Sequence, residues 1–420
     1  MPEPVTRPDA TAAERHVDTR AERLLVVAGI VVLAFNLRPA AVSVGPVLGD
    51  ITAKGTGLGI SPTTAGVLTT LPVLAFASFG AMAPWLAKVV GLHRVTLAAL
   101  ISVVAGLSLR AATHNVPLFL LLSLLSLSGM ATANVLLPSL VKLHFPHRIG
   151  LMTSIYTTSL AVGLTLGSVL TVPLSHQLGG WRWGLGSWAA TAAIAALPWL
   201  LLVRHDQAPE SASSRGISLR DVARTRLGWV MALFFGLQSL QAYSVFGWFA
   251  EVYRDAGFSA GTAGLLLGVI TAASIPLSFW LPTWAARMER QTWLILGLVL
   301  CYPVGYIGLI VAPVTGAWAW ALLIGVAASV FPVVLTLIGL RARSSAGTAA
   351  LSGFTQSVGY LIAAIGPFGM GVLYDLTGGW TVPLVALTAL LVPQLITGLM
   401  AARPSYIEDA VEARRATEPA

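Results

Sequence analysis

The stretch Ala34-Phe35-Asn36-Leu37-Arg38-Pro39 interrupts an apolar run from Leu24 to Gly49 that is otherwise long enough to cross a bilayer. An arginine at this depth costs ~2.5–3.5 kcal/mol even on the more lenient insertion scales. Arg38 lies ~21 Å along a helix from Leu24, too deep for its side chain to reach the near interface easily. We therefore expect Arg38 to bind an anion in a transport path. The alternative is a structural arginine that caps backbone carbonyl groups or reaches the outer interface.

The composition is that of a membrane protein. Hydrophobic residues make up 56% of the 420 positions and charged residues 10%, whereas soluble domains carry about 25% charged residues. This excludes an ordinary soluble enzyme. The net charge of +8 does not indicate a nucleic-acid partner, because the basic residues lie between apolar runs and form no basic face. The single cysteine, Cys301, lies inside an apolar run, so we expect no disulfide, no metal site and no cofactor.

Hydropathy and segment length predict an all-α membrane protein with twelve transmembrane helices in two pseudo-symmetric six-helix bundles. The spans lie near residues 24–49, 62–87, 94–113, 116–141, 150–173, 183–203, 227–250, 261–286, 292–312, 318–340, 348–373 and 381–402. The chain is thereby divided into a cytoplasmic tail (1–23), an N-terminal bundle (24–203), a Pro- and Ser-rich cytoplasmic linker (204–226), a C-terminal bundle (227–403) and a second cytoplasmic tail (404–420).

The Lys and Arg residues are distributed unequally between the two sides of these spans. With the N-terminus inside, 20 of the 25 basic residues fall in cytoplasmic segments and four fall on the other side: Lys54, Arg110, Arg182 and Arg254. Short cytoplasmic loops carry such an excess of basic residues. The sequence therefore predicts a multi-pass protein of the inner membrane with both termini in the cytoplasm.

The two halves of the chain repeat one another. Leu178-Gly179-Gly180-Trp181 follows the fifth span, and Thr377-Gly378-Gly379-Trp380 follows the eleventh. Prolines at equivalent places, Pro138 and Pro332, precede short basic loops in both halves. This pattern indicates a duplicated six-helix unit, and duplicated transporters usually bind their substrate between the halves near the midplane.

The twelve spans, the central linker and the repeat resemble the major facilitator superfamily. Within it, three segments resemble the cyanate/2-nitroimidazole permease (CynX/NimT-type) family: Asn36 to Pro46, Gly236-Leu237-Gln238-Ser239-Leu240, and Leu351 to Pro367. The resemblance covers residues 24 to 402 and implies a carrier of cyanate-like anions or nitroaromatic heterocycles. One feature departs from the superfamily pattern. The loop after the second span keeps the basic residue and glycine of the gating motif but has no acidic residue, so it lacks the acidic half of an ion-paired gate. The candidate gating residues are Lys88, Gly91, Arg94 and Arg287.

Several polar side chains lie inside predicted spans, where they face either substrate or neighbouring helices. Pro39 removes a backbone hydrogen bond to Phe35, which loosens the helix beside Arg38. For Asn134, hydrogen bonding to a neighbouring helix explains the residue as well as substrate binding does. The Ser159–Gly163–Gly167 stripe is better explained by helix packing. The candidate substrate-binding residues are Arg38, Asn36, Asn134, Tyr156, Gln238, Gln241, Gln356 and Tyr360.

No Asp or Glu lies at midplane depth, so the chain offers no evident proton relay and its coupling ion stays open. An unopposed cation favours a small anionic or polar substrate. We expect a monomeric secondary transporter that works by alternating access, and not an enzyme, because no nucleophile–base pair or metal cluster lies inside a span. The alternative is a multidrug-type efflux carrier of apolar compounds in which Arg38 is structural.

Overall fold

The computed structural model describes residues 20–55, 57–206 and 217–417. Within these residues it has twelve helical spans long and apolar enough to cross a membrane. The prediction of an all-α protein with twelve transmembrane helices is thus confirmed. Most of the expected N-terminal tail and the centre of the expected linker, residues 207–216, lie outside the described residues.

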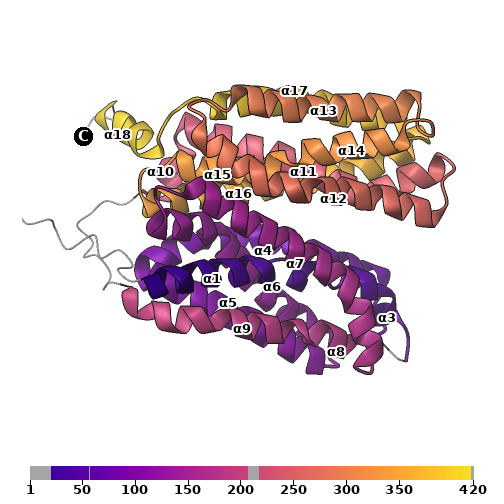
Figure 1. The fold of residues 1–420 in the computed structure, drawn as a ribbon. Helices are drawn as coiled ribbons and strands as arrows, with labels where there is room; N and C mark the ends of the chain where they lie inside the picture. Colours follow the sequence, from indigo (N-terminus) through magenta and orange to yellow (C-terminus); the bar gives the residue numbers. More distant parts are fainter. Residues whose placement is uncertain (1–19, 56, 207–216, 418–420) are drawn as a thin grey trace, which may run out of the picture.

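The spans form two bundles that lie side by side (Figure 1). The helices of the N-terminal bundle are α1 (Arg20–Asn36), α2 (Pro39–Val42), η1 (Gly45–Val47), α3 (Leu48–Thr52), α4 (Pro62–Val90), α5 (Leu92–Ala112), α6 (Val116–His144), α7 (Ile149–Gln177), α8 (Trp181–Gly186), α9 (Trp188–Leu202) and η2 (Val203–His205). Those that follow the linker are α10 (Leu219–Ala223), α11 (Arg226–Asp255), α12 (Ala260–Arg287), α13 (Thr292–Val311), α14 (Ala317–Ala328), α15 (Val330–Leu340), α16 (Ser345–Thr377), α17 (Thr381–Ala401) and α18 (Ile407–Thr417).

Local sequence explains where several of the long helices begin. Ser or Asn side chains at the N-caps of α4, α6, α12 and α16 each accept a hydrogen bond from a backbone N–H in the first turn. Such caps satisfy donors that have no partner inside the helix. The repeated Gly-Gly-Trp motifs lie at equivalent turns, after α7 and after α16, where Gly179 (φ 85°) and Gly378 (φ 67°) adopt left-handed conformations.

The first span, which the sequence predicted as one run over residues 24–49 loosened beside Pro39, is divided into separate helices there. α1 ends at Asn36 and α2 starts at Pro39, so Leu37 and Arg38 lie between two helical segments. Prolines remove a backbone donor and end the preceding helix. The tenth span is also divided, at Ser329 between α14 and α15.

Glycines allow α1 to pack closely on α7. A Cβ atom at Gly163 would overlap the carbonyl oxygen of Phe35, and one at Gly167 would lie 3.0 Å from Cα of Pro39. Ser159, one turn earlier, donates a 2.7 Å hydrogen bond to the carbonyl of Val31. The small-residue stripe therefore serves helix packing, as predicted.

We call the end of the molecule that carries α10, α18 and the ends of the linker the linker end. The two bundles approach each other here and diverge toward the other end (Figure 1). Ser139 on α6 donates a 2.7 Å hydrogen bond to the carbonyl of Ser345 on α16. The hydroxyls of Ser154 on α7 and Thr283 on α12 lie 3.0 Å apart.

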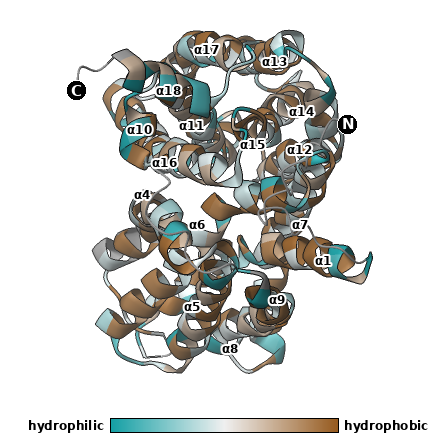
Figure 2. Ribbon diagram, turned by 90° about the vertical axis from the view of Figure 1, so that its left-hand side faces the viewer, coloured by the Kyte–Doolittle hydropathy of each residue, from teal (hydrophilic) through white to brown (hydrophobic). Residues whose placement is uncertain are grey.

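The predicted C-terminal tail contains a helix, α18, that packs against the C-terminal bundle. Ile407 and Val411 of α18 are buried against the C-terminal bundle. The Glu408 carboxylate accepts hydrogen bonds from the backbone N–H groups of Arg343 and Ser344, and Arg415 pairs with Asp221 of α10 at 3.2 Å. Figure 2 looks onto this linker end, where α10 and α18 carry many of the hydrophilic residues.

Candidate functional site

Five side chains from five different spans meet in the middle of the molecule. Arg38 lies near the middle of the first span, Arg20–Thr52. Its guanidinium carbon lies 5.8 Å from the ring centroid of Phe331, at the start of α15 in the opposite bundle. We call the set the central cluster: Arg38, Phe76, Tyr243, Phe331 and Tyr360.

Tyr360 holds the aromatic part of the central cluster together. Its ring centroid lies 4.1 Å from that of Phe76 on α4 and 6.3 Å from that of Tyr243 on α11. The phenol groups of Tyr243 and Tyr360 are close enough to Arg38 to interact with its charge. The cluster thus combines one cation, two hydroxyl groups and four aromatic rings from both bundles.

The central cluster keeps some accessible surface. Arg38, Tyr243 and Phe331 are half-buried, whereas Phe76 and Tyr360 are buried. Among the residues that the structure describes, no carboxylate pairs with Arg38. An uncompensated guanidinium away from bulk water is stabilised by an anion that accepts its hydrogen bonds.

Two of the candidate residues, Asn134 and Gln356, bond directly across the two bundles. Nδ2 of Asn134 donates a 2.6 Å hydrogen bond to Oε1 of Gln356. Gln356 in turn donates from Nε2 to Ser352, 2.8 Å away, and Ser352 donates to the carbonyl of Val135. Gln356 lies one helical turn from Tyr360, on the side of the linker end. The pair therefore lies beside the central cluster on that side.

Two further candidates are engaged within their own bundles. Asn36 donates to the carbonyl groups of Val32 and Thr191 and accepts a 2.7 Å hydrogen bond from the Thr191 hydroxyl. Gln241 donates to the carbonyl of Leu387 and accepts from the hydroxyl of Tyr306, both at 2.9 Å. These bonds tie α1 to α9 and α11 to α13 and α17.

The remaining two candidates, Gln238 and Tyr156, have other neighbours in the structure. Nε2 of Gln238 is 3.4 Å from the carbonyl of Ala328, where the tenth span is divided. Tyr156 on α7 is buried in the hydrophobic core. The structure therefore brings Arg38 and Tyr360 together from the predicted set, and adds Tyr243, Phe331 and Phe76.

The candidate gating residues lie at the linker end. Lys88, Arg94 and Arg287 are exposed. Gly91 has a φ of 105° and caps α5, and a Cβ atom there would lie 2.5 Å from the carboxylate of Asp206. The Asp206 carboxylate accepts hydrogen bonds from the backbone N–H groups of His93 and Arg94. Asp206, at the start of the linker, thereby supplies an acidic partner to the hairpin between α4 and α5, which has no acidic residue of its own.

A comparison with family models matches residues 24–367 to the Major Facilitator Superfamily. The chain belongs to the Major Facilitator Superfamily. It is a multi-pass membrane transporter and not an enzyme, as predicted.

Several relatives of this superfamily member cover most of its length. It is 38% identical to an uncharacterized transporter, YycB, of Bacillus subtilis over 91% of this chain and 94% of that protein. It is 34% identical to a 2-nitroimidazole transporter of Escherichia coli, over 92% and 97% of the two chains. It is 28% identical to the cyanate transport protein CynX of Escherichia coli, over 84% and 90%. The predicted resemblance to the CynX/NimT-type permeases is confirmed.

Solved structures of the superfamily share the fold of this transporter. The structure superposes on the Escherichia coli fucose:proton symporter FucP with a TM-score of 0.73, at 15% identity over 91% of this chain and 99% of that one.

Sequence reasoning missed two kinds of residue. Tyr243 and Phe331 carry no formal charge, and aromatic residues are common in apolar spans, so nothing in their local sequence separates them from core residues. Arg110 was counted with the basic residues outside the membrane, but its side chain is fully buried in the N-terminal bundle. Its position inside the apolar run 94–113 was the available signal.

Proposed function

We propose that this transporter moves a small anionic or polar solute, of the cyanate-like anion or nitroheterocycle class, across the inner membrane by alternating access. Arg38 is the central binding residue in this proposal. The observation that carries it is the position of Arg38: a half-buried cation in the middle of the first span, facing Phe331, Tyr243 and Tyr360 of the opposite bundle with no carboxylate partner among the described residues.

The chemistry of the central cluster suits such a solute. A guanidinium presents planar, paired donors that match the two oxygens of a nitro group or the charge of a small anion. Aromatic rings beside it bind a flat heterocycle through stacking and apolar contact. Two relatives are named for 2-nitroimidazole and for cyanate, which are solutes of these two kinds.

Alternating access requires contacts between the bundles that form and break. The hydrogen bonds Asn134–Gln356, Ser139–Ser345 and Thr157–Ser278 all join the bundles on the linker-end side of the central cluster. If the linker end faces the cytoplasm, as the distribution of Lys and Arg favours, these bonds close the cytoplasmic side of an outward-facing transporter. We propose that the chain acts as a monomer, since the two bundles of a single chain contain all the residues of the central cluster.

A thermal-unfolding assay of the purified full-length protein tests the proposal. Cyanate, nitrate, 2-nitroimidazole and a series of uncharged apolar compounds are added to the parent and to Arg38→Ala in parallel. We expect cyanate or 2-nitroimidazole to stabilise the parent and to leave Arg38→Ala unchanged, because a ligand that binds the folded state raises its stability. Stabilisation of both proteins by bulky apolar compounds alone would support the efflux alternative with Arg38 structural.

A further inference from the structure

Arg110 on α5 is a second buried cation that the transport proposal does not use. Its side chain is 0% exposed. Nη1 lies 3.5 Å from the carbonyl oxygen of Ala40, and neither Nε nor Nη2 has a hydrogen-bond partner among the described residues. Buried donors are almost always satisfied in folded proteins, so two unsatisfied N–H groups on one guanidinium require an explanation.

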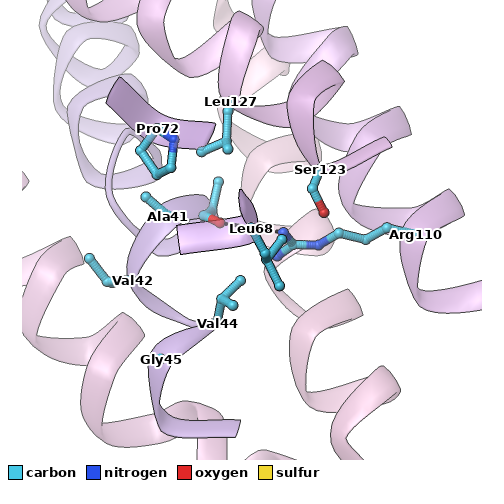
Figure 3. A pocket seen from close by; sticks show the side chains of 10 residues that line it. Ala41, Val42, Val44, Gly45, Leu68, Pro72, Arg110, Ser123 and Leu127 are labelled. Carbon is cyan, nitrogen blue, oxygen red and sulfur yellow. Dashed lines mark hydrogen bonds between the residues drawn. The ribbon is translucent and has the colours of Figure 1, made fainter. Parts of the chain in front are cut away.

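Arg110 is one of the residues that line a partly open cavity of about 290 Å³ in the N-terminal bundle. Figure 3 shows the Arg110 side chain extending into the space between Ser123 on α6 and the segment from Ala41 to Gly45. The Ser123 hydroxyl is likewise buried and without a partner in the described structure. The rest of the lining is apolar and includes Ala40 and Leu68.

We propose that Arg110 and Ser123 form an anion-binding site in this cavity, for a small planar oxyanion of single charge such as a monocarboxylate or nitrate. Nε and Nη2 share one edge of the planar guanidinium, and Nη1, on the other side, is turned toward Ala40. That edge matches two oxygens of a carboxylate or nitrate in a bidentate arrangement. The Ser123 hydroxyl supplies a third donor, and the single cation balances a single negative charge.

The site is separate from the central cluster but physically joined to it. Arg38 is the last residue before α2. Ala40, whose carbonyl accepts the hydrogen bond from Arg110, lies two residues further along, in α2. An anion bound to Arg110 would fix the orientation of its guanidinium, which donates to the carbonyl of Ala40. The proposed site therefore contacts α2, the helix segment that follows Arg38.

The test uses purified full-length protein and two probes, sodium acetate and sodium nitrate. Thermal-unfolding midpoints are measured across a salt series for the parent, for Arg38→Ala and for Arg110→Gln. General salt effects act on all three proteins alike, so they cancel in the comparison. We expect a saturable rise of the midpoint in the parent and in Arg38→Ala, and no saturable rise in Arg110→Gln.

Two further variants cover the case in which Arg110→Gln does not fold. Ser123→Ala removes only a hydroxyl group and should weaken the apparent affinity by about tenfold, as expected for one hydrogen bond to a charged group. Leu68→Trp fills the cavity and should abolish the saturable response. An equal response in the parent and these variants would overturn the proposal. A response that is lost in Arg38→Ala alone would place the anion at Arg38, which overturns the second site and leaves the proposed function intact.

Discussion

Nδ2 of Asn134 and Oε1 of Gln356 lie 2.6 Å apart, one on α6 and the other on α16. Both side chains are at most 5% exposed. The two residues come from different bundles, so their hydrogen bond must break whenever the bundles separate at the linker end. Asn134, for which the sequence left substrate binding and interhelical bonding equally open, and Gln356, a candidate substrate ligand, thus form a contact between the two bundles.

This hydrogen bond should be measurable as a coupling energy. Denaturation of the parent, Asn134→Ala, Gln356→Ala and the double variant forms a double-mutant cycle. We expect a coupling of about 0.6–1.7 kcal/mol, the range found for side-chain hydrogen bonds within membranes. A coupling near zero would show that the two amides do not support each other.

A disulfide across the linker end should lock the transporter. The hydroxyl oxygens of Ser154 and Thr283 lie 3.0 Å apart across α7 and α12, so cysteines at these positions bring two sulfur atoms close together. In a Cys301→Ser background, oxidation of Ser154→Cys/Thr283→Cys should arrest transport and reduction should restore it. Transport that continues in fully cross-linked protein, shown by gel mobility, would mean that this contact need not open.

Close packing at the linker end should depend on Gly150. A Cβ atom at this position would lie 2.5 Å from Cβ of Ala286 and 2.8 Å from the carbonyl oxygen of Pro282. Gly150→Ala should therefore force α7 and α12 apart and slow cross-linking of the Ser154/Thr283 cysteine pair severalfold. Gly268→Ala on α12 is the matched control, because a Cβ atom there meets nothing within 4 Å. Equal cross-linking rates in the two variants would contradict this packing.

Asp206 should stabilise the N-terminal bundle in a pH-dependent way. Burial alone would raise the pKa of Asp206, but hydrogen bonds from the His93 side chain and from the backbone of Arg94 and His93 hold this pKa below its ordinary value. A carboxyl group whose pKa is lowered by folding contributes stability that is fully present above its unfolded pKa. That contribution is lost as the pH falls through the folded value.

Asp206→Ala should accordingly lower the unfolding temperature at pH 7, and the difference from the parent should shrink as the pH falls below about 4. Glu289→Ala, which removes an exposed carboxylate at the same end of the molecule, serves as the control. A difference that stays constant down to pH 3 would assign the loss to packing and not to the charge of Asp206.

The sequence predicted the twelve spans because each is long, apolar and bounded by charged loops. It also predicted a loosened helix beside Pro39, since proline acts on its own helix, but not the full division into α1 and α2. It could not predict the partners of Asn134 or Gln241, because an amide inside a span bonds equally well to substrate, to a carbonyl group or to another amide. Arg110 was assigned to the wrong environment because hydropathy counts do not distinguish a span end that faces solvent from one covered by α2 and α6.

Uptake into proteoliposomes tests the role of Arg38 in substrate binding most directly. Labelled cyanate and 2-nitroimidazole are offered to the parent, Arg38→Ala, Arg38→Lys and Arg254→Ala, the last removing an exposed arginine that pairs with Glu251. We expect Arg38→Ala to abolish uptake, Arg38→Lys to impair it because an ammonium group lacks the planar paired donors, and Arg254→Ala to behave as the parent. Uptake by Arg38→Ala at the parental rate, in protein that is folded and inserted, would contradict the account.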